Sequence, residues 1–428
     1  MPEPLPRLLV IIGSGETSPT MSKVHRELFT RLPSSAGPAV MLDTPFGFQE
    51  NADDVAAKAV TYFRESVNQD VSVVSFRSAD EMDAVALETV LTRLREARWV
   101  FSGPGSPSYA LKQWRDTQVP TLLADKLRTG GCLIFASAAA VTLGPYSLPV
   151  YEIYKVGEPP RWIDGLDLLA AVGLRAVVIP HFNNAEGGRH DTRYCYVGER
   201  RLRVLEAQLP EDVFILGVDE HTACIIDLDA ESVTIAGLGG LTVRYRERFE
   251  RVESGQTLSV NCIRQLARDV AHAGVRAESL VSTVVAGTNA GTQPEPVLAR
   301  SPLLDEIARI EKAFAESLAA RDTRGAVGAV LELDDLLVEW SRDTLQSDEL
   351  DRGRAALRSM VVRLGEAAEA GVRDPREAVA PFVDALLAAR GRARAERRWA
   401  EADELRGALV DAGVEVRDTP EGTEWQVG

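Results

Sequence analysis

Residues 131–140 read GCLIFASAAA, and this stretch decides the fold of the first half of the chain. Its apolar part, Cys132–Ala136, is short and continuously hydrophobic, as expected of a strand that is buried on both faces of a parallel sheet. The small residues Ala138–Ala140 predict the start of a helix. Ser137 therefore stands at an expected turn from strand to helix.

The same alternation of apolar strands and helices extends outward over residues 1–250. Strands are expected at Leu8–Ile12, Ala39–Leu42, Val71–Phe76, Trp99–Phe101, Ala176–Pro180, Val213–Val218, Ala223–Leu228, Ser232–Ala236 and Leu241–Tyr245. Helices are expected at Lys23–Leu32, Ala52–Val67, Asp80–Ala97, Ser108–Trp114 and Val119–Thr129. Short spacers among the last strands favour hairpins at the edge of the sheet. The order predicts an α/β domain with a doubly wound, mostly parallel sheet.

The second half of the chain has a different pattern. After an expected helix at Thr257–Ala273, a stretch rich in Gly, Thr, Pro and Ala at Val275–Ser301 predicts a linker. Apolar residues then recur at helical spacing in Leu303–Arg321, Thr323–Ser341, Glu349–Ala370, Ala378–Arg390 and Arg397–Ala412. We therefore predict four parts: an α/β domain (1–250), a helix and linker (251–301), a helical domain (302–378) and a C-terminal domain (379–428).

Composition narrows the class of protein. The net charge of −16 opposes general attraction to nucleic acid or anionic lipid, although a local basic patch remains compatible with RNA. The four cysteines are far apart and mostly in apolar stretches, which favours buried thiols over metal ligands or disulfides. The N-terminus lacks the charge of a signal peptide, and no apolar run is long enough to span a membrane. A cytoplasmic protein without cofactor or metal is expected.

Ser137 is the first candidate for chemistry. A serine lifted above a sheet at a strand-to-helix turn has helix-start amides beside it, among them that of Ala138, that can stabilise an oxyanion. Such a serine needs a base and an acid that orients the base. His181 ends an expected strand, and Glu152 lies between the two in the chain. The alternative is that Ser137 only caps its helix and that His181 has a structural role.

Residues 1–250 resemble the cyanophycinase and aspartyl-dipeptidase branch of the class I glutamine amidotransferase-like fold. The matching stretches are Ile11–Glu16, Phe101–Ala110, Gly131–Ala140, Pro180–Phe182 and Gly217–Ala223.

The resemblance implies a serine peptidase with Ser137 as nucleophile, His181 as base and Glu152 as the acid, for which Glu158 is an alternative. It implies an oxyanion and substrate loop that includes Gly103, Gly105 and Ser106. It also implies arginines that hold acidic peptides, with Arg189, Arg193 and Arg201 as loose counterparts.

This sequence departs from the family pattern around the serine. The family has glycine two residues before and two residues after the nucleophile, where this chain has Phe135 and Ala139. Glycine tolerates the strained backbone of such a turn more readily than either residue. An inert scaffold with the same fold therefore stays open as an alternative to an enzyme.

Two further motifs are weaker. Gly13-Ser14-Gly15 resembles half of a dinucleotide fingerprint, but Ser18 replaces its third glycine, so NAD binding is not favoured. Asp219-Glu220-His221 contains three metal-ligand types in a row. Consecutive strand residues point to opposite faces, so a structural or supporting role is preferred. His190 and Asp191 near His181 have no metal-ligand spacing.

The last fifty residues resemble the C-terminal domain of cysteinyl-tRNA synthetase, through Ala402–Arg406, Gly413–Glu415, Asp418–Pro420 and Gly422–Trp425. The resemblance implies contact with tRNA. Five arginines lie within Arg390–Arg398, and Trp399 follows; Arg394, Arg397, Arg398 and Trp399 are the RNA-binding candidates. The opposing interpretation is a solvated helix face, since residues 379–428 hold seven basic and ten acidic side chains.

Two functions from different classes follow. The first is a serine hydrolase of amide or ester bonds that acts on an acidic peptide or a tRNA-linked substrate. The second is an inert adaptor that binds tRNA, other RNA or protein through its C-terminal region. Aminoacylation itself is not expected, because no synthetase ATP motif is present. Assembly into a homo-oligomer is compatible with either function.

Overall fold

The computed structural model describes residues 5–33, 37–187, 190–272, 301–343, 349–372, 375–419 and 422–427. The chain divides into two compact units. The first comprises Met1–Asp305 together with Leu336–Leu350, and the second comprises Glu306–Asp335 and Asp351–Gly428. The expected linker lies, except for Ser301, outside the described residues. The four-part division of the chain stays a prediction.

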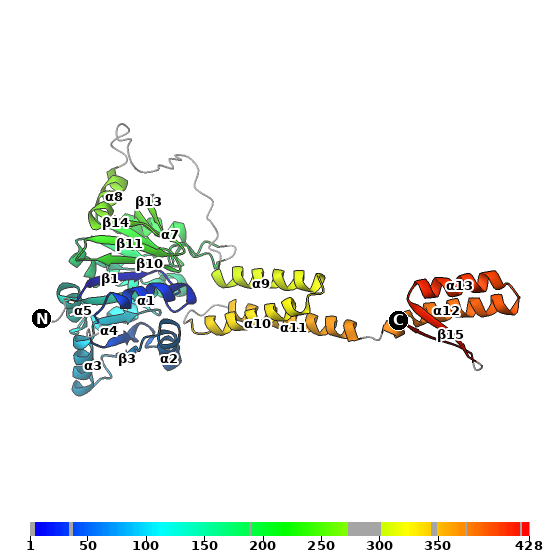
Figure 1. The fold of residues 1–428 in the computed structure, drawn as a ribbon. Coiled ribbons are helices and arrows are strands. Elements are labelled where there is room, and N and C mark those ends of the chain that lie inside the picture. Colours follow the sequence, from blue (N-terminus) through cyan, green and yellow to red (C-terminus); the bar gives the residue numbers. More distant parts are fainter. Residues whose placement is uncertain are drawn as a thin grey trace. The chain divides into compact units, whose positions relative to one another are not determined.

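An eight-stranded sheet forms the centre of the first unit (Figure 1). Its strand order is β14-β11-β10-β1-β5-β4-β2-β3. The strands are β1 (Arg7–Ile12), β2 (Ala39–Leu42), β3 (Ser72–Val74), β4 (Trp99–Ser102), β5 (Gly131–Ala136), β10 (Thr222–Asp227), β11 (Ser232–Gly237) and β14 (Thr257–Ser259). The five strands from β1 to β3 in this order are parallel, and β10 pairs antiparallel with β1. The expected α/β class, with a mostly parallel sheet and an antiparallel hairpin at one edge, is confirmed.

A second sheet was not anticipated. Its order is β13-β12-β9-β8, formed by β8 (Ala176–Ile179), β9 (Phe214–Val218), β12 (Gly240–Tyr245) and β13 (Arg248–Glu253). Strands β8 and β9 are parallel, whereas β12 pairs antiparallel with both β9 and β13. The sequence predicts β8, β9 and β12 but not β13, and periodicity does not tell which neighbour a strand pairs with, so the two sheets could not be separated. A small hairpin joins β6 (Tyr146–Ser147) to β7 (Ile163–Asp164).

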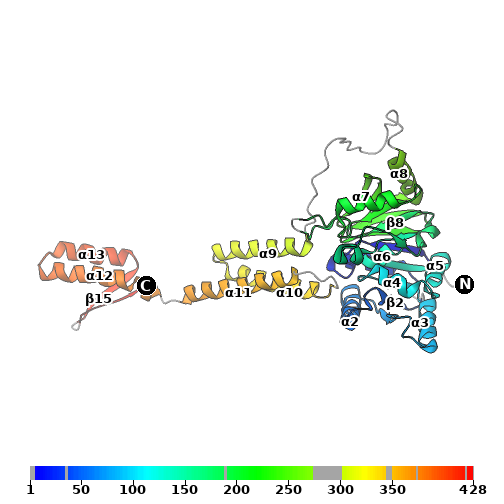
Figure 2. The same ribbon diagram turned by 180° about the vertical axis from the view of Figure 1, so that it is seen from behind.

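Helices cover both faces of the main sheet (Figures 1 and 2). The helices of the first unit are α1 (Ser22–Thr30), α2 (Ala52–Tyr62), α3 (Ala84–Glu96), α4 (Pro107–Trp114), α5 (Val119–Thr129), α6 (Ser137–Val141), α7 (Gly198–Gln208) and α8 (Val260–His272). Of these, α7 packs against the second sheet. Short 3-10 segments at Pro19–Met21, Thr44–Phe46 and Leu168–Val172, and π-helical turns at Phe63–Val67 and Glu152–Val156, complete the unit.

The alternation of side chains along β1 explains the two covered faces. Leu8 and Val10 pack with α1 and α2 in one core, whereas Leu9 and Ile11 pack with α3 and α5 in the other. Successive strand residues point to opposite faces, so a strand buried on both sides must be apolar throughout. This is why the central strands have continuous apolar sequences.

The helices that follow the first unit are α9 (Pro302–Ala319), α10 (Thr323–Trp340) and α11 (Glu349–Val372). Buried residues at helical spacing, including Ile307, Ile310 and Phe314 on α9 and Leu333 on α10, form their contact faces. Helix α10 contributes residues to both compact units, because its end from Leu336 onward belongs to the first. None of the described helices is long and apolar enough to cross a membrane.

The C-terminal part of the second unit consists of α12 (Pro375–Ala395), α13 (Trp399–Asp411) and a hairpin of β15 (Val414–Thr419) and β16 (Gly422–Val427). Val383, Leu409, Val414 and Val416 form its core. Gly413 has a φ of +83° directly after α13, as expected for a glycine that ends a helix. The sequence analysis predicted this end of the helix but not the hairpin.

Candidate active site

Ser137 lies where β5 ends and α6 begins, as the sequence predicts. Its φ is +47°, a left-handed conformation that costs a non-glycine residue free energy and is typical of functional turns. The Ser137 side chain is half-buried rather than sealed in the core. Phe135 and Ala139 are fully buried, and neither has a positive φ. The turn therefore needs no glycine at these two positions.

Ser137 is the first member of a chain of hydrogen bonds. Its Oγ lies 2.9 Å from His181 Nε2. On the other side of the ring, His181 Nδ1 donates to Glu220 Oε1 at 2.8 Å. Because Nδ1 faces a carboxylate, Nε2 is left to accept a proton from the serine hydroxyl. Asn184 also donates to Glu220 Oε1, at 2.9 Å, and holds the carboxylate in place.

The topology explains why residues so distant in sequence meet. His181 and Glu220 each lie two residues beyond the carboxyl end of a strand, β8 and β9 respectively, and these two strands are parallel neighbours. The amide of His181 donates to Gly13 O at 3.3 Å, so the loop after β8 joins the loop after β1. Strand ends of both sheets thus converge beside Ser137, the usual position of ligand sites in open α/β folds.

Burial and charge compete at the histidine–glutamate pair. Burial disfavours charge on His181, but the hydrogen bond and the negative charge of Glu220 outweigh it, so the pKa of His181 is raised above its usual 6.5. Burial likewise disfavours the Glu220 carboxylate, but its bonds to His181 and Asn184 hold the pKa below the usual value. The arrangement therefore stabilises a positively charged imidazole.

Glu152 does not occupy the position expected for it. Its Oε1 accepts a hydrogen bond from Ser108 at 2.5 Å, and its π-helical turn places it against the start of α4 instead of His181. The alternative, Glu158, pairs with Arg161 on the surface. Glu220, which the sequence analysis assigned a structural or supporting role, takes the place beside His181. The available signal was its position just after the expected strand Val213–Val218; that this strand neighbours the one before His181 is seen only in the structure.

The expected oxyanion loop lies against the start of α6. Ala139 N donates to Gly103 O at 3.1 Å, which fastens the loop to the helix. Gly105 has a φ of +133°, and a Cβ there would lie 2.0 Å from Pro45 O, so only glycine fits. Ser106 Oγ caps α4 by accepting from Tyr109 N. The amide of Ala138 belongs to the first turn of α6, where helix geometry provides no intrahelical acceptor.

Two of the three arginines considered for substrate binding, Arg193 and Arg201, lie within the described residues. Arg193 donates two hydrogen bonds of 2.8 Å to Asp191, and this contact lowers the pKa of Asp191 to about 2. Arg201 lies half-buried on α7. Arg189 lies outside the described residues. The positive charge of Arg193 is thus already balanced by Asp191.

The weaker motifs have structural contacts. Asp219 accepts from Gly240 N and Arg251, Glu220 faces His181, and His221 Nδ1 lies 2.9 Å from Thr20 Oγ1. These three neighbouring residues therefore point to different partners. A Cβ on Gly15 would lie 2.3 Å from His221 Nδ1, so a side chain of this chain occupies the space beside that glycine.

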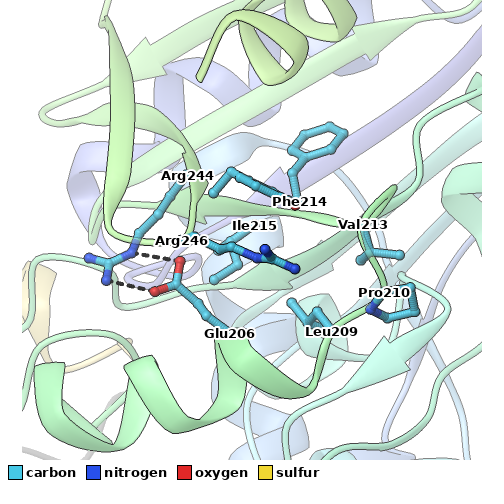
Figure 3. Close-up of a pocket in the computed structure, with 9 residues that line it drawn as sticks. Glu206, Leu209, Pro210, Val213, Phe214, Ile215, Arg244 and Arg246 are labelled. Atoms are coloured by element: carbon cyan, nitrogen blue, oxygen red, sulfur yellow. Dashed lines mark hydrogen bonds and ion pairs between the residues drawn. The ribbon is translucent and has the colours of Figure 1, made fainter. Parts of the chain in front are cut away.

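A separate small pocket lies between α7 and the second sheet, as Figure 3 shows. Its lining includes Glu206, which accepts two hydrogen bonds from the buried Arg244. Ser137, His181 and Glu220 are not among its lining residues. The pocket is therefore distinct from the hydrogen-bonded site.

The RNA-binding candidates of the tail differ in their contacts. Arg394 donates to Asp418, and Arg398 is paired with Glu396 and Glu401. Arg397 is exposed, with a φ of +59°, and Trp399 is 56% exposed. A large exposed aromatic next to an exposed arginine is the part of this surface best suited to stacking with a base.

Comparison with known proteins supports the resemblance of the tail. Residues 376–425 match the cysteinyl-tRNA ligase anticodon binding domain. The chain is 53% identical over 45 residues to a cysteine–tRNA ligase of Bdellovibrio bacteriovorus and 51% identical over 45 residues to that of Parvibaculum lavamentivorans. Each match covers 10% of this chain, and the chain spans only 9% and 10% of those relatives' length.

Two solved structures are similar to the front of the chain. One is a peptidase from an acI-B1 Actinobacterium, with 16% identity and a TM-score of 0.49, covering 60% of this chain and 97% of that one. The other is a peptidase E candidate from Listeria monocytogenes EGD-e, with 16% identity and a TM-score of 0.37, covering 55% and 100%. The strand order and connections of the first unit show its α/β fold independently of these two similarities.

Proposed function

We propose that the first unit is a serine hydrolase that cleaves an amide or ester bond. The observation that carries the proposal is the continuous set of hydrogen bonds from Ser137 through His181 to Glu220, at 2.9 and 2.8 Å. A nucleophile within reach of a base, which a third group orients, is the arrangement that activates a hydroxyl. Ser137 is the nucleophile, His181 the base and Glu220 the orienting acid.

The reaction follows from these positions. His181 Nε2 takes the hydroxyl proton as Ser137 Oγ attacks the carbonyl carbon, and Glu220 stabilises the resulting imidazolium. The amide of Ala138 and the Gly103–Gly105 loop are the donors nearest to the developing oxyanion. The imidazolium then protonates the leaving amine or alcohol, which leaves an acyl ester on Ser137. Water, deprotonated by His181, hydrolyses this ester and restores the serine.

Backbone strain favours an enzyme over an inert scaffold. Both Ser137 and His181 have positive φ, +47° and +48°, although neither is glycine. Conformations of this kind cost about 1–3 kcal/mol each and persist where function requires them. A scaffold that only binds through its tail has no need of such strain at the two residues that hydrogen-bond each other.

The C-terminal domain indicates the class of substrate. We propose that it contacts tRNA, as the matched anticodon binding domain suggests, so that the hydrolase acts on an ester or amide linked to tRNA. The neutralisation of Arg193 by Asp191 weakens the case for an acidic peptide. The second candidate, an RNA-binding adaptor, is supported by the same domain match over residues 376–425.

A fluorophosphonate probe tests the hydrolase. The wild-type chain should gain one covalent adduct, measured by intact mass. Ser137→Ala should gain none, while Ser254→Ala, which changes an exposed serine far along the chain, should react as the wild type does. If the wild type stays unlabelled from mildly acidic to alkaline pH while binding tRNA, the adaptor is the better explanation.

A further inference from the structure

The end of α10 belongs to the same compact unit as the Ser137 site, although it follows the linker in sequence. Trp340, the last residue of α10, and Arg342 and Asp343 just after it contact other residues of the first unit. Trp340 packs edge-on against His221, with ring centroids 5.9 Å apart. Arg342 pairs with Glu65 at 2.8 Å, and Asp343 Oδ1 accepts a hydrogen bond from Thr17 at 3.0 Å. Trp340 and Asp343 are only 6% and 7% exposed.

These contacts meet the two loops that hold the catalytic groups. His221 directly follows Glu220, so Trp340 packs against the neighbour of the orienting acid. Thr17 lies in the loop after β1, whose Gly13 carbonyl accepts from the His181 amide. The end of α10 therefore touches both segments that position the imidazole.

Glu16 directly precedes Thr17, the hydrogen-bond partner of Asp343, and the reaction proposed above does not use it. Its side chain is 3% exposed, and a Cβ on Gly103 would lie 3.2 Å from its Oε1, which places the carboxyl against the oxyanion loop. Burial raises the pKa of Glu16 to about 7; its own backbone amide opposes this, and the negative charge of Asp343 adds to it.

Four titratable groups of the described residues interact with Glu16: Asp343, His181, Tyr62 and His25. Asp343 and His181 act on it through their charges, and its own charge acts on Tyr62 of α2. His25 of α1 contacts its main-chain carbonyl at 2.8 Å. Burial lowers the pKa of His25 to about 4 and raises that of Tyr62, so both are neutral near pH 7. Burial is the main cause of the raised pKa of Glu16; the charge of Asp343 raises it further, and that of His181 lowers it.

We propose that Asp343 is a positioning residue of the hydrolase site, supplied by the helical region, and that it acts through Thr17 and Glu16 on His181. The proposal rests on the hydrolase function proposed above. It means that the active centre is not contained in the α/β domain alone. The residues that contribute to it from beyond the linker lie in Leu336–Leu350, which belongs to the first unit.

The proposal predicts that substitutions of Glu16 and of Asp343 change the pKa of His181 in opposite directions. An ionised Glu16 stabilises the imidazolium, so Glu16→Gln should lower the pKa of His181 by about half a pH unit. Burial is the main reason that the pKa of Glu16 is raised, and the negative charge of Asp343 adds to it, so Asp343→Asn should lower the pKa of Glu16. Glu16 is then ionised over a wider pH range, so the pKa of His181 should rise by a similar amount. A loss of packing alone does not produce shifts of opposite sign.

The test is an NMR titration of His181 in the full chain, with its signal assigned by comparison with His181→Asn. We expect the pKa of His181 to fall in Glu16→Gln and to rise in Asp343→Asn. The double variant should have the same His181 pKa as Glu16→Gln. Asp343→Glu, which keeps the negative charge, should titrate as the wild type does. Asp335→Asn, which changes an exposed carboxylate on α10, eight residues before Asp343, is the matched control. An Asp343→Asn titration equal to that of the control overturns the proposal.

Two further measurements distinguish an unfolded variant from a failure of the hydrolase proposal or of the proposed role of Asp343. Thermal unfolding shows whether each variant is folded; if Asp343→Asn is not, then Glu16→Gln decides, and an unchanged His181 titration overturns the proposal. Fluorophosphonate labelling of the wild type tests the hydrolase itself. A wild type that is never labelled refutes the hydrolase, and the role of Asp343 with it, whereas normal labelling without the opposite shifts refutes only the role of Asp343.

Discussion

The turn at Ser137 and the basic run at Arg390–Arg398 are organised in opposite ways. At Ser137, polar groups are joined in series, His181 is 4% exposed, and two residues have strained backbones. In the basic run, Arg394 and Arg398 make exposed ion pairs with carboxylates of the same domain.

The buried site at Ser137 is stronger evidence of function than the exposed ion pairs of the basic run. Burying polar groups and straining the backbone costs stability, so such a site is retained for a reason. Exposed ion pairs contribute little to stability and form wherever opposite charges are near each other. The geometry at Ser137 is therefore strong support for chemistry, whereas charge in the tail is weak support for RNA binding.

The largest expected effect is that of removing the nucleophile. Ser137→Ala should reduce hydrolysis of an activated ester by about a thousandfold or more, because Ser137 is the one hydroxyl that bonds to His181 among the residues the structure describes. The fold should be retained, since the side chain is half-buried and the alanine is smaller. Steady-state kinetics with thermal unfolding as the control measure both. If Ser137→Ala keeps an activity close to that of the wild type, the geometry at Ser137 is no better evidence of function than the ion pairs of the basic run at Arg390–Arg398.

The next effect separates the two candidate acids. Glu220→Gln should lower kcat by about a thousandfold, because the amide no longer stabilises the imidazolium or fixes its tautomer. Glu152→Gln should change kcat by less than about threefold, since Glu152 bonds Ser108 and not His181. The two variants differ from the wild type by the same atoms, so each is a control for the other. Equal losses would contradict the assignment of Glu220.

The pH dependence should reflect the raised pKa of His181. The base must be neutral to accept a proton, so kcat/KM should rise with pH through a midpoint above 6.5. In Glu220→Gln the residual activity should have a lower midpoint, because the stabilising charge is absent. The charged form of His181 also stabilises the fold below pH 6.5, and this contribution is lost as the pH rises through the raised pKa. An activity that is independent of pH in this range would argue against His181 as the base.

The smallest effect concerns the tail. Trp399→Ala and Arg397→Ala should each weaken tRNA binding by about tenfold, through lost stacking and a lost phosphate contact. Arg398→Ala should have a smaller effect, because Arg398 is already paired with Glu396 and Glu401. Filter binding at two salt concentrations measures each change. If the three variants weaken tRNA binding equally, or not at all, then the ion pairs of Arg398 do not determine which side chains contact tRNA.

Much of the fold could be predicted from the sequence because it depends on local patterns. The strand at Ala39–Leu42 and the helix at Val119–Thr129 have the expected bounds, since an apolar run and a helical period mark them directly. The second sheet could not be predicted, because the pairing of β8, β9 and β12 depends on contacts between distant segments. The expected helix at Thr257–Ala273 begins instead at Val260, after β14 pairs with β11.

The candidate site shows the same division. Ser137 and His181 could be identified because each follows an apolar run that ends at one rim of a sheet. The chain alone pointed to Glu152 as the acid, since it lies between the other two in sequence. Contact with His181 is instead made by Glu220, which lies closer in space but farther along the chain.

The sequence by itself determined which segments are strands and helices, where the serine turn lies, and that the tail is similar to the anticodon binding domain of a synthetase. Periodicity, residue size and short motifs encode these features locally. Only the tertiary structure decided that Glu220 orients His181 and that Asp343 lies beside the loop of Thr17. Both contacts join residues that are distant in the chain, and they form only once the two sheets and α10 have packed together.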